Sequence, residues 1–254
     1  MINSKQTVLI TGAGSGIGRA IALHLAQAGL ELVVTDVNEQ AAQAVCDEIL
    51  ADNGSARALR LDVSQQSEIE AVCQSVKVDI LVNNAGIQHV AMLERFPADK
   101  WRLLNDILLV GPAMLTRGVL PHMKQSGFGR IINVGSIHAL VASPYKSAYV
   151  AAKHGLLGFS KVVALETAEF DITINTLCPS YVKTPLVEKQ ISQQAEEHGI
   201  SEDEVINNIM LEPMPKKAFI ELSELCGSID FLRSAAARNM TGQTLVLDGG
   251  WTAK

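Results

Sequence analysis

Two ionisable side chains, Tyr149 and Lys153, stand four residues apart in this sequence. Residues at this spacing share one face of a helix, so the phenol and the ammonium would lie close together. A phenol with a pKa of about 10 is a poor base at neutral pH, but a neighbouring positive charge stabilises its phenolate. Ser136 follows a strand-like segment, and its hydroxyl can hydrogen-bond the same alcohol or carbonyl oxygen. The three residues predict proton transfer to and from a small substrate.

A glycine-rich turn near the start of the chain predicts a binding site for a dinucleotide. Glycines stand at positions 12, 14, 16 and 18, directly after a strand-like segment and at the beginning of a helix-like one. Glycine permits the tight turn and the close approach of backbone N–H groups, and the positive helix terminus attracts a pyrophosphate. The predicted contacts in this turn are Gly12, Ser15, Gly16, Ile17 and Gly18.

Asp36 ends the next strand-like segment, 18 residues after Gly18. A carboxylate there accepts hydrogen bonds from the ribose hydroxyls of NAD and repels the 2′-phosphate of NADP. No Arg or Lys stands at Ser15 or Val37 to attract that phosphate. The sequence therefore predicts NAD as the cofactor.

Further cofactor contacts are predicted where later strands end. Asp62 follows the third strand-like segment, where it either closes an adenine pocket or caps a helix. Asn84, Ala85 and Gly86 follow the fourth segment, and such residues suit close passage of a cofactor, although they also suit an ordinary turn. The predicted set is completed by Val63, Val182, Tyr149 and Lys153.

Strand-like and helix-like segments alternate along the whole chain. Such alternation predicts βαβ units with right-handed crossovers and a parallel sheet. The length of 254 residues fits one large α/β domain or two small ones, and no Pro/Gly/Ser linker divides the chain. We therefore predict a single doubly wound, Rossmann-type α/β domain over residues 1–254. The predicted strands are residues 7–11, 31–35, 58–61, 79–82, 129–134, 172–177 and 244–247, and the predicted helices are residues 16–28, 40–52, 64–75, 97–122, a segment from Tyr149 onward, and 223–234.

Residues 184–218 interrupt the alternation with a charged, helix-rich insertion. Ser201 and Glu204 have the spacing of a capping box, which predicts the start of a second short helix. The insertion is either a lid over a substrate or a solvated pair of surface helices, and both remain open. Within the predicted helix 97–122, Gly111 and Pro112 predict a kink, because proline removes a donor and clashes with the preceding turn.

Composition and charge exclude several classes of protein. Hydrophobic residues make up 48% of the chain, which excludes disorder, and a net charge of -6 without a basic run excludes nucleic acid and anionic membranes as partners. The apolar stretches fall short of the about 20 residues that a membrane span needs, and we expect no signal peptide. The 4 cysteines lack CxxC spacing and a clustered histidine, so we expect no metal site and a reducing, cytoplasmic location.

These motifs occur together in the short-chain dehydrogenase/reductase family, which the chain resembles over nearly its whole length. A Tyr-x-x-x-Lys spacing alone arises by chance in many helices, but its combination with the other motifs is highly specific. The resemblance implies a parallel sheet of about seven strands, a nicotinamide cofactor and assembly into homotetramers. It also implies that Ser136, Tyr149 and Lys153 are catalytic, with Tyr149 as general acid and base. The matching segments are residues 11–12, 83–86, 136, 149–153 and 247–250.

Within that family the chain is similar to bacterial D-3-hydroxybutyrate dehydrogenases. The implied reaction is the reversible, NAD-dependent oxidation of (R)-3-hydroxybutyrate to acetoacetate. In isolation each matching residue could be an ordinary surface or core residue, but a cation with amide and imidazole donors suits an enclosed carboxylate. The implied substrate-binding residues are Gln88, His138, Lys146, Tyr149, Tyr181, Gln190 and Trp251.

Departures from the family pattern leave other functions open. Leu108 stands seven residues after Trp101, where the family carries an Asn that helps a water connect the catalytic lysine to solvent. Asn105, one helical turn earlier, is a candidate to compensate. Ser180 and Tyr181 replace a usual glycine and tryptophan near the nicotinamide. The alternatives are a dehydrogenase for another small oxo acid or secondary alcohol, and an NAD(H)-binding protein with weak catalysis.

Overall fold

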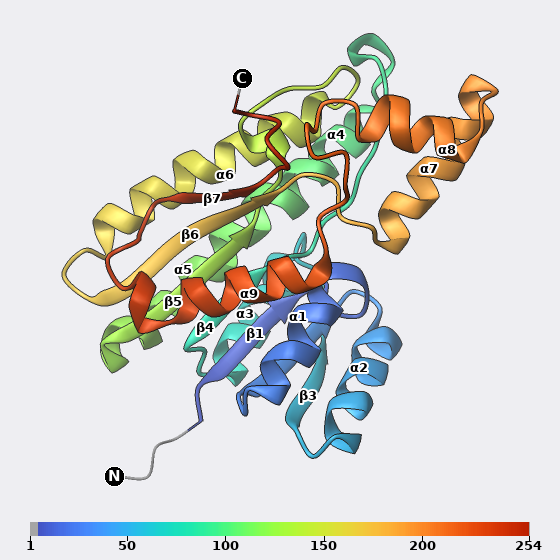
Figure 1. Ribbon diagram of the computed structural model, residues 1–254. Coiled ribbons are helices and arrows are strands. Elements are labelled where there is room, and N and C mark those ends of the chain that lie inside the picture. Colours follow the sequence, from blue (N-terminus) through green and yellow to red (C-terminus); the bar gives the residue numbers. More distant parts are fainter. Residues whose placement is uncertain (1–4, 254) are drawn as a thin grey trace.

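The structure, a computed structural model, describes residues 5–253, except the side chains of residues 186, 193, 197 and 198. A parallel sheet of seven strands lies at its centre, in the order β3-β2-β1-β4-β5-β6-β7, and helices flank it on both sides (Figure 1). The prediction of a doubly wound, Rossmann-type α/β fold is confirmed. The strands are β1 (Thr7–Thr11), β2 (Glu31–Asp36), β3 (Ser55–Arg60), β4 (Ile80–Asn83), β5 (Phe128–Val134), β6 (Asp171–Pro179) and β7 (Thr244–Leu247).

Apolar side chains of each central strand are divided between two cores, one on each face of the sheet. In β1, Val8 and Ile10 belong to one core, whereas Leu9 belongs to the other, because successive side chains point to opposite faces. The helices of the first core are α1 (Gly16–Gln27), α2 (Glu39–Ala51) and α9 (Leu222–Arg233), and those of the second are α3 (Gln66–Ser75), α5 (Gly111–Ser126) and α6 (Ser147–Glu166). Short 3₁₀ turns are η1 (Leu93–Arg95), η3 (Ile137–Ala139) and η5 (Ala235–Ala237).

Strand β3 begins at Ser55, whereas the sequence predicts a start at residue 58. This is the largest difference between a predicted and an observed start. Strand β3 is the edge strand, and none of its residues is fully buried. It therefore lacks the continuous apolar run that marks the central strands. Helix α6 begins at Ser147, so Tyr149 and Lys153 both lie within its first two turns, as their spacing predicts.

The predicted helix 97–122 consists of α4 (Ala98–Asn105), a π-helical turn η2 (Asp106–Val110) and α5. Pro112 has no N–H to donate to the carbonyl of Leu108, four residues earlier. The N–H of Gly111 bonds to the carbonyl of Asp106, five residues earlier, which widens the turn. The expected distortion thus lies just before the proline and takes the form of a π turn.

By length and composition alone, the continuous helical segment Ala98–Ser126 could cross a membrane, with a mean hydropathy of 1.4 over its most apolar window. This corrects the expectation that every apolar stretch is too short. Leu104, Leu115 and Met123 of this segment are fully buried within the fold. The apolar composition is therefore explained by a helix that packs in the core.

The insertion at residues 184–218 leaves the sheet after β6 and lies beyond it, to one side (Figure 1). It contains α7 (Pro185–His198), α8 (Glu202–Val205) and a second π turn, η4 (Ile206–Met210). The predicted capping box is confirmed: the N–H of Ser201 donates to Glu204 Oε2 at 2.9 Å, and the N–H of Glu204 donates to Ser201 Oγ at 3.2 Å. The two stems of the insertion meet where the N–H of Ile220 donates to the carbonyl of Tyr181 at 2.9 Å.

Candidate active site

A cavity of about 740 Å³ opens at the carboxyl ends of the strands. Its walls include the loops that follow β1 and β4, where the strand order reverses. Open α/β sheets bind their ligands in this crevice. The predicted cofactor, substrate and catalytic residues all line the cavity, except Gly18 and Trp251.

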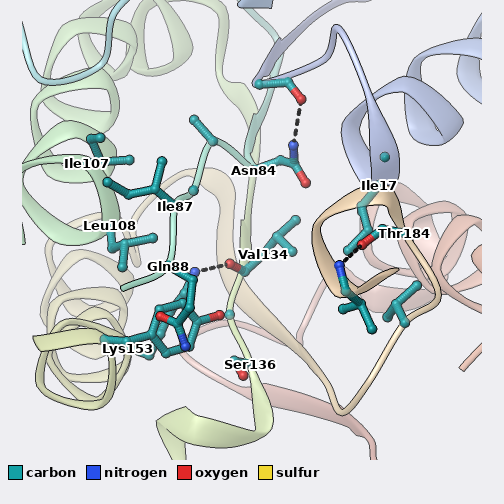
Figure 2. A pocket seen from close by; sticks show the side chains of 18 of the residues that line it. Ile17, Asn84, Ile87, Gln88, Ile107, Leu108, Val134, Ser136, Lys153 and Thr184 are labelled. Carbon is teal, nitrogen blue, oxygen red and sulfur yellow. Dashed lines mark hydrogen bonds between the residues drawn. The ribbon is translucent and has the colours of Figure 1, made fainter. Parts of the chain in front are cut away.

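The glycine-rich turn after β1 is packed too closely for larger residues. A Cβ atom on Gly12 would lie 2.8 Å from the Cα atom of Ala85, and one on Gly18 would lie 2.4 Å from the Gly12 carbonyl. Asn84 holds the turn, because its Nδ2 donates to the carbonyl of Gly12 at 3.0 Å (Figure 2) and to that of Thr11 at 2.9 Å. Gly18 thus permits the packing under the turn and is not among the residues that line the cavity, so its role as a cofactor contact stays a prediction.

Helix α1 begins at this turn with a terminus suited to an anion. Its N-cap residue, Ser15, makes no side-chain capping bond, so the first N–H groups of the helix keep their capacity to donate. Ser15, Gly16 and Ile17 line the cavity. A pyrophosphate there would meet both these donors and the positive end of the helix dipole. The turn therefore fits the diphosphate of a nicotinamide dinucleotide.

Carboxylates occupy the part of the cavity beside β2 and β3. The Oδ2 atom of Asp36 accepts the N–H of Gly14 at 3.0 Å, and its Oδ1 atom accepts the N–H of Asn38 at 2.9 Å. These bonds fix the carboxylate, and each oxygen keeps a second lone pair for a ligand hydroxyl. Asp62 also lines the cavity, and its Oδ1 atom accepts the hydroxyl of Ser64 at 2.7 Å.

Ser136, Tyr149 and Lys153 meet on the cavity wall formed by β5 and α6. Lys153 Nζ lies 5.7 Å from the centroid of the Tyr149 ring and donates to the carbonyl of Val134 at 2.7 Å (Figure 2). Ser136 Oγ accepts the N–H of His138 at 3.1 Å. The phenol, ammonium and hydroxyl predicted to act together are therefore brought into one wall.

A buried polar network fixes α6 against the sheet. Asn83 Nδ2 on β4 donates to Asn133 Oδ1 on β5 at 2.8 Å, and Asn133 Nδ2 donates to Ser160 Oγ on α6 at 3.0 Å. Buried polar groups that are paired in this way specify one arrangement of the elements that carry them. The network therefore helps to hold the helix that carries Tyr149 and Lys153.

Burial is the largest influence on the pKa of both α6 residues. It raises the pKa of Tyr149, while a hydrogen bond with Ser136 works in the opposite direction. It lowers the pKa of Lys153 to about 8, although the Cys178 thiol opposes this shift. Burial therefore dominates the pKa of the phenol even with the Lys153 ammonium nearby, so the spacing of the two residues does not by itself produce a lowered pKa. A further positive charge is needed to make Tyr149 an effective base.

The predicted carboxylate-binding residues come from separate segments of the chain and line the same cavity. They are Gln88 after β4, His138 after β5, Lys146 before α6, and Gln190 on α7. Lys146 Nζ lies 3.2 Å from His138 Nε2. Burial, followed by the charge of Lys146, lowers the pKa of His138 to about 4. The imidazole is therefore neutral at pH 7, and its Nε2 atom accepts a hydrogen bond from the ammonium.

Aromatic rings lie behind these polar groups. The ring of Tyr181 lies 5.7 Å from Lys146 Nζ. Trp251 stacks on Tyr181 with the ring centroids 6.2 Å apart, and its ring centroid is 5.9 Å from that of His138. Trp251 does not itself line the cavity. It supports two residues that do line the cavity, and its contact with the substrate stays a prediction.

The chain matches the model of the short chain dehydrogenase family over residues 6–195. It belongs to the short-chain dehydrogenase/reductase family. A D-beta-hydroxybutyrate dehydrogenase from Rhizobium meliloti (strain 1021) is 44% identical over 256 residues, covering 98% of this chain and 99% of the relative. The uncharacterized oxidoreductase YxjF from Bacillus subtilis (strain 168) is 39% identical, with 98% of this chain and 99% of that protein covered.

A solved structure of an actinorhodin polyketide ketoreductase variant with NADPH has a TM-score of 0.93 and 30% identity, and the match covers 98% of each chain. The chain is thus an oxidoreductase of the short-chain family, which binds a nicotinamide cofactor. These relatives have different names, so family membership alone does not select a substrate.

This short-chain dehydrogenase carries Leu108 at the π turn. The side chain is buried against α6 and lines the cavity, and a Cβ atom on Gly86 would lie 3.3 Å from its Cδ2 atom. Asn105 Nδ2 donates to the carbonyl of Trp101 at 2.9 Å, and Asn105 does not line the cavity, so it does not replace the missing amide. Pro112 instead leaves the Leu108 carbonyl without its α-helical donor, so this carbonyl can still bind a water.

Most of the apolar residues that line the cavity were not predicted from the sequence. Leu103 and Ile107 line the cavity one helical turn apart, and Ile87 stands directly after Gly86 (Figure 2). The four-residue spacing of Leu103 and Ile107 is visible in the sequence, but apolar residues at that spacing also occur in helices that only pack against a core. Ser180 lines the cavity as well, and its hydroxyl donates to Met214 Sδ at 3.3 Å.

Proposed function

We propose that this protein is an NAD-dependent 3-hydroxybutyrate dehydrogenase that interconverts (R)-3-hydroxybutyrate and acetoacetate. The observation that carries this proposal is the half-buried ammonium of Lys146 in the cavity that also contains Tyr149. None of the ion pairs in the described part of the chain includes Lys146. A desolvated cation without a counterion favours a ligand that brings a carboxylate.

The amides of the same cavity support a carboxylate ligand. Gln88 Oε1 is buried and has no hydrogen-bond partner, so its amide group has bonding capacity left for a ligand. Gln190 supplies a second amide from α7, a helix of the insertion. A small acid bound by Lys146, Gln88 and Gln190 would place its keto or hydroxyl carbon toward Ser136 and Tyr149.

NAD is the proposed cofactor. The first N–H groups of α1 would hold the pyrophosphate, and Asp36 would accept the ribose hydroxyls. The lysines and arginines among the cavity-lining residues are Lys146, directly before α6, and Lys153 on α6, and neither belongs to the neighbourhood of Asp36. A 2′-phosphate would therefore meet a carboxylate without a compensating cation, so NADP should bind less tightly.

The proposed reaction removes a hydride from C3 of the substrate and a proton from its hydroxyl. The oxidised cofactor supplies the hydride acceptor and a positive charge beside Tyr149. Ser136 donates a hydrogen bond to the substrate oxygen, and the Tyr149 phenolate accepts the proton. Lys153 holds positive charge near the phenol ring and favours the phenolate. In the reverse direction Tyr149 returns the proton to the carbonyl oxygen.

A second candidate substrate is another small oxo acid. The observation that favours it is the position of Trp251, which lies against Tyr181 and His138 and not in the cavity lining, so the methyl end would have space for a longer chain. A slightly larger acid would then bind with the same carboxylate contacts. A neutral secondary alcohol is less favoured, because it would leave Lys146 without a counterion.

We also propose a homotetramer in the cytoplasm. Apolar side chains of α6, Val162 and Leu165, are 53% and 80% exposed, and Val110 on the adjacent helical segment is 46% exposed. Such surface favours association between copies of the chain. The cysteines are free, which suits a reducing compartment. Light scattering on the purified protein measures the mass, and a monomer would contradict the tetramer.

The function is tested by mixing purified protein with NAD and each enantiomer of 3-hydroxybutyrate while NADH absorbance is followed. The (R) enantiomer should be oxidised, the (S) enantiomer and 2-butanol should not, and NADP should support a slower rate. An absence of NADH formation at high enzyme concentration would contradict the proposal. Faster oxidation of a longer 3-hydroxy acid would favour the second candidate.

A further inference from the structure

We propose that Tyr145 is a positioning residue, whose left-handed backbone points the neighbouring Lys146 into the cavity. The inference rests on the proposed function for the identity of the ligand. The backbone hydrogen bond that joins the two loops can be measured by hydrogen exchange without any substrate.

Tyr145 has a backbone conformation that its own side chain opposes. Its φ angle is +68°, in the left-handed region that residues with a Cβ atom rarely adopt. Pro144 and Tyr145 form the centre of a turn, and the position after proline in such a turn usually carries glycine or asparagine when φ is positive. A tyrosine there must be held by the surrounding structure.

The side chain of Tyr145 is more exposed than buried. It is 52% exposed, and it takes part in none of the aromatic contacts among the described residues. The backbone does have a partner, because the Tyr145 carbonyl accepts the N–H of Ala91 at 3.0 Å. This bond crosses between two loops that are far apart in the sequence.

The two joined loops are those that carry the proposed carboxylate-binding groups. Ala91 stands three residues after Gln88, and Tyr145 directly precedes Lys146. On its other side Lys146 is fixed by α6, since its carbonyl accepts the N–H of Val150 at 2.9 Å. The chain is therefore held on both sides of Lys146, with its Nζ atom 3.2 Å from His138 Nε2.

A right-handed or extended conformation at Tyr145 would rotate its carbonyl away from Ala91. The same rotation would change the direction in which the chain enters α6, and with it the position of the Lys146 ammonium. The ligand contact would then weaken, because a charged hydrogen bond depends steeply on distance and angle. The α1 terminus, which follows β1, and Asp36, at the end of β2, lie across β4 from β5 and would keep their geometry.

The test compares substitutions that differ in their tolerance of positive φ. Tyr145→Val and Tyr145→Pro oppose it, whereas Tyr145→Gly and Tyr145→Asn accept it and remove the ring. Val and Pro should raise KM for 3-hydroxybutyrate about 10-fold or more, since a small misplacement of a binding group has a large effect. NADH affinity should stay within about 2-fold in every variant, and the Gly and Asn variants should keep a wild-type KM.

Asn53 offers a matched control, because its φ angle is +60° and it lies in the turn between α2 and β3, outside the cavity lining. Asn53→Val creates the same kind of strain and should lower stability without changing KM. If Tyr145→Gly and Tyr145→Asn raise KM as much as Tyr145→Val, the ring matters and not the backbone, and the proposal is overturned. An unchanged KM in both Tyr145→Val and Tyr145→Pro would also overturn it.

Hydrogen exchange separates this inference from the proposed function. The amide of Ala91 should be protected in the wild type and in Tyr145→Gly, and should exchange faster in Tyr145→Val and Tyr145→Pro. This result is independent of turnover. A wild-type protein inactive on 3-hydroxybutyrate but with this exchange pattern would contradict only the substrate. Equal exchange of Ala91 in wild type, Tyr145→Val and Tyr145→Pro would contradict the positioning role itself.

Discussion

The ammonium of Lys146 lies 3.2 Å from His138 Nε2, and none of the ion pairs in residues 5–253 includes it. The neutral imidazole accepts one of its three N–H groups, which leaves two that can donate to a ligand. The pair therefore keeps a positive charge in the cavity and orients it, without neutralising it.

Replacing Lys146 by Met should remove the main attraction for the carboxylate. Hydrogen bonds to charged groups contribute about 1.5–3 kcal/mol, so KM for 3-hydroxybutyrate should rise about 10- to 100-fold. The affinity for NADH, measured by fluorescence, should not change. Lys161→Met provides the control, since Lys161 is an exposed lysine on α6, the helix that Lys146 directly precedes. An equal rise in KM for a neutral alcohol would argue against a carboxylate contact.

The binding of the acid should weaken at high pH earlier than an ordinary lysine would allow. Burial lowers the pKa of Lys146, and only its protonated form attracts the carboxylate. KM should therefore rise as the pH increases through this lowered pKa. In a Lys146→Arg variant, the rise should move to higher pH because guanidinium stays protonated. A KM profile that is the same for Lys and Arg would assign the pH effect to another group.

Tyr149→Phe should abolish turnover and leave the cofactor site intact. The phenol is the proposed proton acceptor, and loss of a general base typically lowers rates by about 10²- to 10⁴-fold. NADH affinity should remain within about 2-fold of wild type, as it depends on the glycine-rich turn and Asp36. Comparable kcat values for the two proteins would refute the proposed role of Tyr149.

The preference for NAD over NADP should reverse when the carboxylate of Asp36 is removed and a positive charge is introduced beside it. In the double variant Asp36→Ser and Val37→Arg, NADP should gain and NAD should lose about 10-fold or more in kcat/KM. Asp47→Ser, at an exposed position on α2, should leave the preference unchanged. If wild type already uses NADP as well as NAD, the role proposed for Asp36 is wrong.

Leu108→Asn tests whether the protein is a weak catalyst because an amide is missing. The Leu108 carbonyl already lacks its α-helical donor, so the substitution should change kcat by less than about 3-fold. It should also lower the free energy of unfolding by about 1–3 kcal/mol, since a fully buried apolar group becomes polar. A protein that is inactive with leucine and active with asparagine would support the weak-catalysis alternative.

Most of the fold and much of the candidate site could be predicted from local patterns. The strand and helix alternation, the spacing of Tyr149 and Lys153, and the capping box at Ser201 each depend on residues close together in the chain. The sequence predictions were less accurate where the environment decides. Strand β3 is a half-exposed edge, and it begins at Ser55 and not at the predicted residue 58.

Local patterns in the sequence were enough to predict the parallel α/β fold, the glycine-rich turn and the candidate residues for proton transfer. The environment of those candidate residues depends on the packing of distant segments. Packing brings Gln88, His138 and Lys146 together from separate loops, and burial lowers the pKa values of His138 and Lys146. The positive φ of Tyr145 also depends on the tertiary structure, because a tyrosine in an isolated chain disfavours this conformation. Local patterns arise from neighbours along the chain, whereas desolvation and strain depend on which distant segments the fold places side by side.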